Sequence, residues 1–300
     1  MFRHTAVLII AASLLLSACG AAGEKASENS TPAGEPTTTI QEEQSGSNLS
    51  ETGESAPAET EPATDESTAT EEGSAPAPSE QAPAEEKVEQ TYHMNSNYYI
   101  KPNDDTSPSK VVLLTFDDGP KEEKMINSLI DTLDKHNAKA IFFVNGYRVK
   151  SHPELLKLIH ERGQIVGNHA WDHEDLKKMS NAEAAKQVTD VQKIVKDTIG
   201  EKPQFFRPPF GSGNDALKAT VKKKGMLYMT WSNGSLDWDK STKDKPEKVI
   251  QNVLDQLNPG SNILMHELPW TVEALDELLT KLEQKGYSFV DPRAIELEAR

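Results

Sequence analysis

Between residues 91 and 300, short apolar runs alternate with longer amphipathic stretches. The apolar runs predict seven strands, at Val111–Thr115, Ala140–Val144, Gln164–Gly167, Phe205–Arg207, Leu227–Trp231, Asn262–Met265 and Tyr287–Val290. Tyr98-Tyr99-Ile100 predicts an additional edge strand. The amphipathic stretches have the apolar period of helices and cover Glu122–Lys135, Pro153–Arg162, Asn181–Ile199, Asn214–Lys224, Lys245–Leu257 and Val272–Lys285. Strands that alternate with helices of this length indicate parallel βαβ units.

The predicted fold class is therefore α/β, a distorted (β/α)7 barrel with parallel strands and one unit fewer than the usual eight-unit barrel. An open, doubly wound parallel sheet is the alternative. Gly119-Pro120 after the first strand is a turn and does not match a dinucleotide-binding glycine loop.

The composition changes sharply before residue 91. Residues 20–90 hold 17 acidic side chains against two basic ones, a net charge of −15, and contain no Phe, Trp or Tyr. Such a segment buries too little apolar surface to fold, so we expect a disordered acidic linker. Residues 91–300 have a net charge of −2 and lack the basic footprint of a nucleic-acid-binding protein.

The first nineteen residues have the features of an export signal. Arg3 precedes the apolar stretch Val7–Leu16, which is too short to span a bilayer and ends in Leu16-Ser17-Ala18-Cys19. This ending resembles the bacterial lipoprotein signal, in which the cysteine is lipidated; an ordinary secretory signal is the alternative. We therefore expect a signal peptide at 1–18, lipidated Cys19 and linker at 19–95, and a folded domain at 96–300. Cys19 is the single cysteine, which excludes an internal disulfide.

Unusual polar residues follow the predicted strands, and in a parallel barrel all these positions open on one face. They are Asp117, Asp118, His169, His173, Arg207, Asp237 and His266.

Three of these residues have the donor types of a catalytic zinc site. His169 and His173 are four residues apart, so on a helix or helical turn their imidazoles share a face. A carboxylate from Asp117-Asp118 would complete a set of two histidines and one carboxylate with open positions. Non-haem iron oxygenases use the same donors, but this sequence lacks their usual His-x-Asp/Glu pair. A plain tight turn is the structural alternative for Asp117-Asp118-Gly119-Pro120.

Adjacent aspartates on an extended strand point in opposite directions. One can then bind the metal while the other accepts a proton from water. Arg207, held by Asp237, is expected to keep that base ionised.

Five ordered segments resemble the motifs of the polysaccharide deacetylase family, also called carbohydrate esterase family 4 or the NodB-homology domain. They are Thr115-Phe116-Asp117-Asp118-Gly119-Pro120, His169-Ala170-Trp171-Asp172-His173, Arg207-Pro208-Pro209-Phe210-Gly211, Asp237-Trp238 and Leu264-Met265-His266. The resemblance covers roughly residues 98–292 and makes 96–300 the catalytic domain.

The resemblance implies metal-dependent removal of N-acetyl groups from N-acetylglucosamine polymers such as peptidoglycan or chitin-like oligomers. By position, Asp117 is the base and His266 the acid, while Asp118, His169 and His173 bind the metal, most simply Zn²⁺, with Co²⁺ or another divalent ion as alternatives. The backbone N–H of Phe210 would stabilise the oxyanion. Trp238 and Leu264 would wall the acetyl pocket; ordinary core packing is the alternative for both and explains them nearly as simply.

The sequence departs from the family pattern at three positions. Ala170 replaces the usual Ser or Thr, Gly234 replaces an earlier aspartate of the fourth motif, and Phe210 replaces the commoner Tyr. None of them removes an expected ligand or proton carrier. The loop residues Asp172, Glu174, Ser235 and Glu267 are candidates for substrate selection.

We therefore expect a monomeric hydrolase, anchored by lipid to the outer face of the bacterial cell membrane, that acts on a cell-wall glycan and not on nucleic acid. A glycan-binding lipoprotein without catalytic activity is the alternative. A glycosidase using Asp117 and Asp118 is a weaker one, because neighbouring residues are poorly placed to flank a glycosidic bond.

Overall fold

The computed structural model describes residues 88–300. Its strands are β1 (Tyr92–Met94), β2 (Ile100–Pro102), β3 (Val111–Gly119), β4 (Ala140–Val144), β5 (Ile165–Asn168), β6 (Phe205–Phe206), β7 (Leu227–Tyr228), β8 (Asn233–Gly234), β9 (Ser261–His266) and β10 (Ser288–Phe289). Its α-helices are α1 (Glu123–Lys135), α2 (Gly146–Ser151), α3 (Pro153–Glu161), α4 (Asn181–Ile199), α5 (Asp215–Lys223), α6 (Pro246–Asp255) and α7 (Pro269–Gln284). Short 3-10 turns are η1 (Leu176–Lys178), η2 (Pro209–Gly211) and η3 (Pro292–Ala294).

The expected α/β fold with parallel strands is confirmed. The main sheet has the order β7-β6-β5-β4-β3-β9-β8, and β10 pairs in parallel with the first residues of β3. Strands β7 and β8 are the two ends of this order, so the curled sheet is a barrel left open between them. All seven predicted strands are present, and β8 is an additional strand of two residues beside β9.

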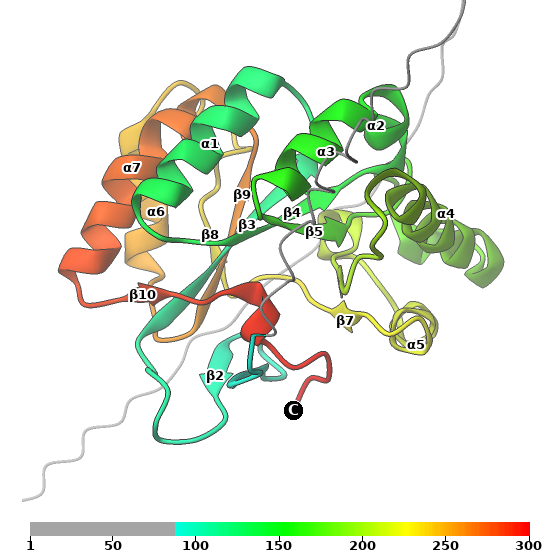
Figure 1. Ribbon diagram of the computed structural model, residues 1–300, viewed down its shortest axis with the longest axis horizontal. Helices are drawn as coiled ribbons and strands as arrows, with labels where there is room; N and C mark the ends of the chain where they lie inside the picture. Colours follow the sequence, from blue (N-terminus) through cyan, green and yellow to red (C-terminus); the bar gives the residue numbers. More distant parts are fainter. Residues whose placement is uncertain (1–87) are drawn as a thin grey trace, which may run out of the picture. The chain divides into compact units, whose positions relative to one another are not determined.

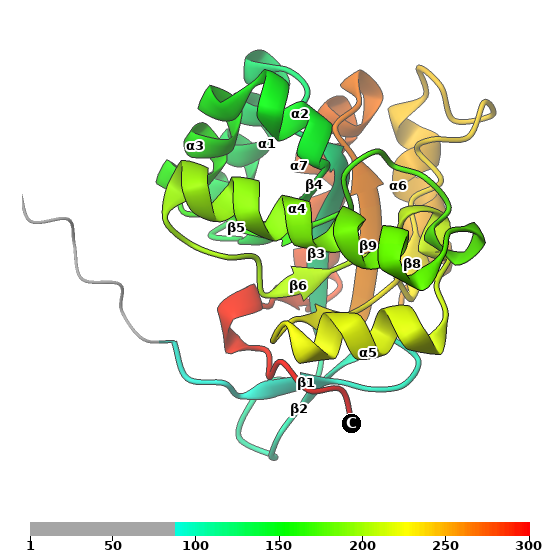
Figure 2. The same cartoon turned by 90° about the vertical axis from the view of Figure 1, so that its right-hand side faces the viewer.

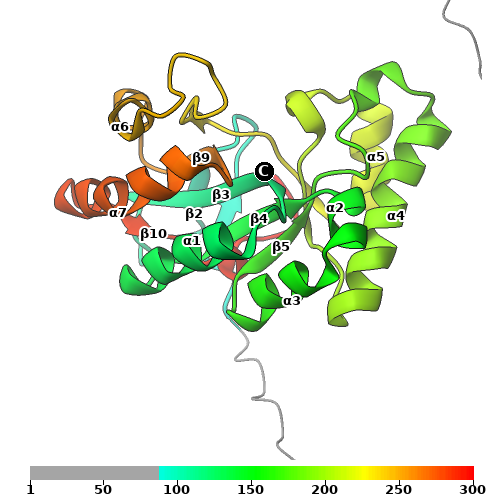
Figure 3. The same ribbon diagram turned by 90° about the horizontal axis from the view of Figure 1, so that it is seen from above.

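The helices form one layer around the outside of the sheet (Figures 1 and 3). Neighbouring helices contact each other in the order α6, α7, α1, α3, α4 and α5. The main apolar core lies between this layer and the sheet, where Phe116, Phe142 and Met265 are buried. A second apolar cluster, which includes Leu113, Phe143 and Phe205, fills the inner face. Because β3 is apolar on both faces, it is buried almost throughout.

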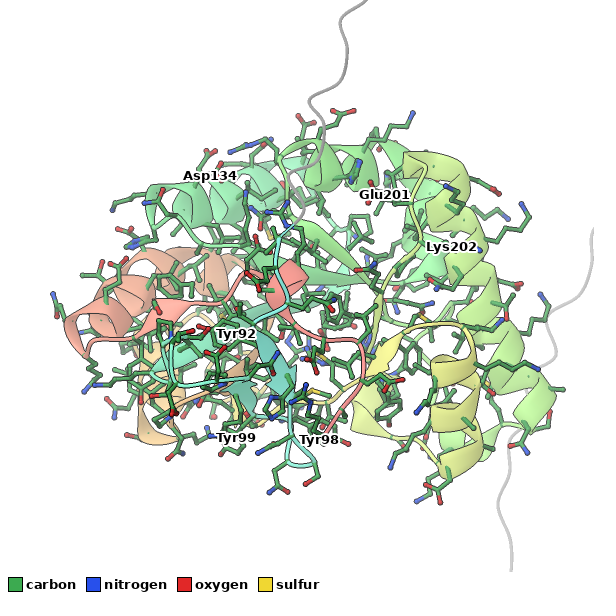
Figure 4. All side chains as sticks on the ribbon, turned by 60° about the horizontal axis from the view of Figure 1, so that its bottom comes forward. Tyr92, Tyr98, Tyr99, Asp134, Glu201 and Lys202 are labelled. Atoms are coloured by element: carbon green, nitrogen blue, oxygen red, sulfur yellow. The ribbon has the colours of Figure 1, made fainter. Side chains whose placement is uncertain are left out.

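The β1–β2 hairpin and the C-terminal segment close one end of the inner face (Figures 1 and 2). Tyr92 bridges to Ile295, and the backbone N–H of Ile100 donates to the carbonyl of Gly260 at 2.8 Å. Figure 4 shows Tyr92 in this region, near the hairpin loop that carries Tyr98 and Tyr99. This end lies opposite the polar strand ends, so the site opens on one face.

The predicted start of the folded domain at residue 96 is wrong. Tyr92 and Met94 are buried in β1, within the segment expected to be linker. Their alternation is too short to stand out in the sequence, and the strand depends on pairing with β2 and Ile295. The signal peptide, Cys19 and the acidic linker up to residue 87 lie outside the described residues. Within residues 88–300, no helix combines the length and apolar character needed to cross a membrane.

Candidate active site

The parallel register brings the polar strand ends together. Asp117 on β3 lies opposite His266 on β9 in the strand pairing. The loop after β5 carries His169 and His173, and Arg207 follows β6 directly. The loop after β8 supplies Asp237. Residues separated by up to about 150 positions in the sequence therefore share one edge of the sheet.

Asp118, His169 and His173 form a compact group of potential metal ligands. Asp118 Oδ1 lies 3.3 Å from Nε2 of His169 and 3.1 Å from Nε2 of His173. One ligand atom from each residue lies within 4.8 Å of the others. Burial alone would raise the pKa of Asp118, but the surrounding imidazoles, including that of His266, hold it well below its ordinary value.

The atoms of this group face each other in a way that a cation would explain. Nδ1 of His169 lies 2.8 Å from the carbonyl oxygen of Arg207, which can only accept a hydrogen bond. In the neutral tautomer, Nε2 of His169 therefore carries a lone pair toward Asp118. Asp118 Oδ1 is buried and has no hydrogen-bond partner among the described residues. Two imidazoles and a carboxylate aimed at one point fit a divalent ion with open positions.

The two histidines do not lie on a helical turn, contrary to expectation. Residues 169–173 form an irregular loop in which Ala170 and His173 adopt left-handed backbone conformations, with φ of 63° and 53°. Side chains fix this loop: Asn168 Oδ1 accepts from the N–H of Ala170, and Gln187 Oε1 accepts from the N–H of Trp171. The imidazole centroids still lie 5.1 Å apart.

Asp117 is held by a buried arginine. Arg207 is fully buried, and its Nη1 donates to Asp117 Oδ1 at 2.7 Å. The same guanidinium donates to the carbonyl of Thr230 and to Asn262 Oδ1. Burial lowers the pKa of Arg207, while the charge of Asp117 opposes this effect. The second carboxylate oxygen of Asp117 lies 3.7 Å from Nε2 of His169, beside the ligand group.

The expected support of Arg207 by Asp237 is wrong, because Asp237 pairs with His266. Its Oδ1 lies 2.7 Å from His266 Nδ1, and its Oδ2 accepts from the backbone N–H of His266 and from Thr271 Oγ1. Burial opposes the charging of His266, but Asp237 outweighs it and raises the pKa of the imidazole. His266 Nε2 lies 4.0 Å from Asp118 Oδ2, at the edge of the ligand group.

Apolar side chains line the approach to these groups. The ring of Phe210, 65% exposed, packs with its edge against His173. Trp238 packs against His266 and is 45% exposed. Leu264 is buried on β9, two residues before His266 and so on the same face of the strand. Leu236 is also exposed in the loop after β8, but an isolated leucine gave no signal in the sequence.

Two of the proposed substrate-selecting residues are buried. Ser235 is 0% and Glu267 is 1% exposed, so neither offers a surface to a polymer. Burial raises the pKa of Glu267 to about 7, although Lys121 and Arg148 oppose that rise. Thr271 and Asn262 support the site but carry no recognisable motif, so the sequence did not single them out.

Comparisons with known proteins identify the family. Residues 104–229 match the model of the polysaccharide deacetylase family. A peptidoglycan N-acetylglucosamine deacetylase from Bacillus cereus is 38% identical over 188 residues, which cover 60% of this chain and 68% of that protein. The chain belongs to the polysaccharide deacetylase family.

Other relatives match a stretch of similar length. The peptidoglycan N-acetylmuramic acid deacetylase PdaC from Bacillus subtilis is 38% identical over 189 residues, 62% of this chain and 39% of PdaC. This polysaccharide deacetylase domain thus matches about two fifths of the length of PdaC, and likewise of the Listeria monocytogenes deacetylase PgdA.

Solved structures of family members have the same fold. The PdaC structure superposes with a TM-score of 0.55 at 36% identity and covers 61% of this chain and 87% of the PdaC chain. A pseudoenzyme of carbohydrate esterase family 4 from Bacillus anthracis superposes with a TM-score of 0.58 at 30% identity, over 60% of this chain and 63% of that one.

Proposed function

We propose that this protein is a metal-dependent deacetylase that releases acetate from N-acetylglucosamine-containing glycan of the bacterial cell wall. The observation that carries this proposal is the ligand group of Asp118, His169 and His173, flanked by one carboxylate and one imidazole that are each held by an opposite charge. A zinc ion bound there would supply Lewis-acid chemistry by polarising the acetamide carbonyl and acidifying water.

In this proposal the chain's own residues move two protons. Asp117 accepts a proton from the attacking water, and Arg207 orients its carboxylate by donating a hydrogen bond to Oδ1. As the C–N bond breaks, imidazolium His266 donates its Nε2 proton to the leaving amine, because Asp237 occupies Nδ1. The products are acetate and a free amine on the sugar. The N–H of Phe210 would donate to the oxyanion, and Trp238 and Leu264 would enclose the acetyl methyl group.

The proposed location is outside the cytoplasm, with Cys19 as the lipid anchor to the membrane. Its support is the sequence around Cys19 together with the names of the relatives, which act on peptidoglycan. Labelling of cells with a fatty-acid analogue would test the anchor, and a Cys19→Ala chain should take up no label.

The proposed activity is tested by acetate release from chitooligosaccharides and from muropeptides. The chain is stripped with a chelator and assayed with and without added zinc. Acetate release that depends on zinc supports the proposal. The rates with the two glycans show which of them is the better substrate. If the zinc-loaded chain releases acetate from neither glycan, the deacetylase proposal is wrong.

A glycan-binding role without turnover is the second candidate, because one structural relative is a pseudoenzyme. Asp117 and His266 argue against it, since binding alone needs neither proton carrier. Retention of the zinc-loaded chain on peptidoglycan, without acetate release, would favour this role.

A further inference from the structure

Glu267 lies beside the end of β3, the strand that carries the metal ligand Asp118. It directly follows His266, the last residue of β9, and its carboxylate reaches Gly119 and Lys121. His266 itself is paired with Asp117 in the sheet. Its side chain is 1% exposed, which excludes contact with a polymer in solution.

The carboxylate of Glu267 spans the turn after Asp118. Oε2 accepts a hydrogen bond from the backbone N–H of Lys121 at 2.8 Å. Oε1 occupies the place that a side chain at Gly119 would take, since a Cβ built there would overlap it. The φ of Gly119 is not left-handed, so the need for glycine here comes from the close approach of Glu267 and not from the backbone.

Asp118 needs such a support. Its φ of 66° is left-handed, a conformation that costs a non-glycine residue free energy and persists where the surroundings hold it. The chain leaves Asp118 through Gly119, so a clamp from Gly119 to Lys121 restricts the direction in which the Asp118 carboxylate points. His169 and His173 belong to a different segment, the loop after β5.

We infer that Glu267 is a positioning residue that acts through Asp118 and sets the affinity of the ligand group for its metal. The inference rests on the proposed function, because it assumes that the group binds a divalent ion. The clamp also joins the end of β3, which carries the base Asp117, to the residue that follows the acid His266.

The test uses four variants of the full chain: Glu267→Ala, Glu267→Gln, Gly119→Ala and the double variant Gly119→Ala/Glu267→Ala. The primary readout is the zinc dissociation constant, measured by competition with a chromophoric chelator; kcat and KM are measured at saturating zinc. Circular dichroism reports folding. Glu273→Ala, which removes an exposed glutamate of α7, is the matched control.

Glu267→Ala should weaken zinc binding about 10- to 100-fold, the range for residues that orient a metal ligand. At saturating zinc, kcat should recover to within a few-fold and KM should not change. Glu267→Gln should keep the wild-type dissociation constant within about threefold, because its amide oxygen still accepts from the N–H of Lys121. Gly119→Ala should weaken binding as Glu267→Ala does, since its methyl displaces the carboxylate.

The double variant decides the mechanism. With the carboxylate gone, the methyl of Ala at position 119 has room, so the double variant should bind zinc no more weakly than Glu267→Ala. An unchanged zinc dissociation constant in Glu267→Ala would overturn the inference. So would a result in which Gly119→Ala weakens zinc binding equally in the wild-type chain and in Glu267→Ala. If Glu267→Ala does not fold, Glu267→Asp and Gly119→Ala carry the same comparison, and wild-type affinity in both would refute the inference. Failure of the wild-type chain to bind zinc would instead refute the proposed function.

Discussion

Each of the two proton carriers of the site is paired with a side chain of the opposite charge. Asp117 is held by the buried guanidinium of Arg207, and His266 by the carboxylate of Asp237. Arg207 orients the carboxylate of Asp117, and Asp237 favours the imidazolium form of His266, which is ready to donate a proton. The orientation of the base and the charge of the acid are therefore set by the protein before substrate binds.

Replacing Asp117 with Asn should lower kcat about 10²- to 10⁴-fold, because the amide cannot accept a proton from water. Zinc content should not change, since the ligands Asp118, His169 and His173 remain. Acetate release and metal analysis of the purified chain check both expectations. Loss of zinc together with activity would show that Asp117 is a ligand and contradict its role as base.

Replacing Asp237 with Asn should lower the pKa of His266, because Asp237 contributes most among the carboxylates that raise it. The proposed acid must be protonated, so kcat should begin to fall at a lower pH than in the wild-type chain. A pKa raised by folding stabilises the protein below the ordinary histidine value of about 6.5 and ceases to do so as pH rises through the folded value. The loss of stability in Asp237→Asn should therefore be largest at acidic pH.

The pH profile of kcat and urea unfolding at several pH values measure these effects. Asp276→Asn, which removes an exposed carboxylate beside His136 and remote from the site, is the control for activity and should leave the pH profile of kcat unchanged. An unshifted kcat profile in Asp237→Asn would mean that His266 is not the acid.

At the scale of single residues, the sequence identified the charged groups but not their partners. The sequence places Asp237 and Arg207 at the same face, and the predicted contact is between these two residues. In the structure the backbone N–H of His266 and the hydroxyl of Thr271 orient Asp237 toward the histidine. Which of several charges at one sheet edge pair with each other depends on loop conformations, and these carry no periodic signal.

At the scale of elements, the long amphipathic helices were predictable, whereas helix α2 and strand β8 were not. Helix α4 has a full capping box of Ser180 and Glu183 and a left-handed Gly200 at its end, so its limits could be predicted. Helix α2 has six residues and β8 has two, too few for a pattern to repeat. Both are formed by tertiary contacts: β8 exists because it pairs with Ile263 and Leu264 of β9.

Attachment of the β1–β2 hairpin depends on one glycine. Gly260 has φ of 89°, and a Cβ there would overlap the backbone carbonyl oxygen of Ile100, which cannot move aside as a side chain can. Gly260→Ala should lower the free energy of unfolding by about 3 kcal/mol or more. Gly200→Ala is the matched control, because Gly200 has a similar φ of 84° but open space around it. This substitution should lower the free energy of unfolding by only about 1 kcal/mol. Urea denaturation measures both; equal costs would show that the close approach contributes nothing.

At the scale of the whole molecule, the inner face of the sheet is layered from one end to the other. Apolar residues such as Leu113 lie toward the hairpin, a buried polar band of Thr115, Asn262 and Arg207 follows, and the proton carriers and ligands lie at the open end. Because side chains alternate, the same face of β3 carries Leu113, Thr115 and Asp117 in succession. The apolar residues thus lie at one end of the inner face, and the polar band separates them from the charged groups at the open end. The ligand group joins β3 to the loop after β5.

A metal bound between these segments should stabilise the fold, since it binds the native arrangement far better than the unfolded chain. At a zinc concentration 100 times the dissociation constant, the free energy of unfolding should rise by about 2.7 kcal/mol. For a domain of this size that corresponds to an increase in Tm of about 5 to 10 °C. Differential scanning calorimetry of the full chain, stripped and then titrated with zinc, measures this change.

Variants of the site separate specific binding from general effects of zinc. Asp117→Asn should show the full increase in Tm because it keeps all three ligands, whereas His169→Ala and Asp118→Asn should show little or none. Asp118→Asn is the stricter comparison, since asparagine tolerates the left-handed backbone and preserves the shape of the loop. An equal increase in Tm in Asp118→Asn and the wild-type chain would place the stabilising ion elsewhere and remove the basis of the proposed chemistry.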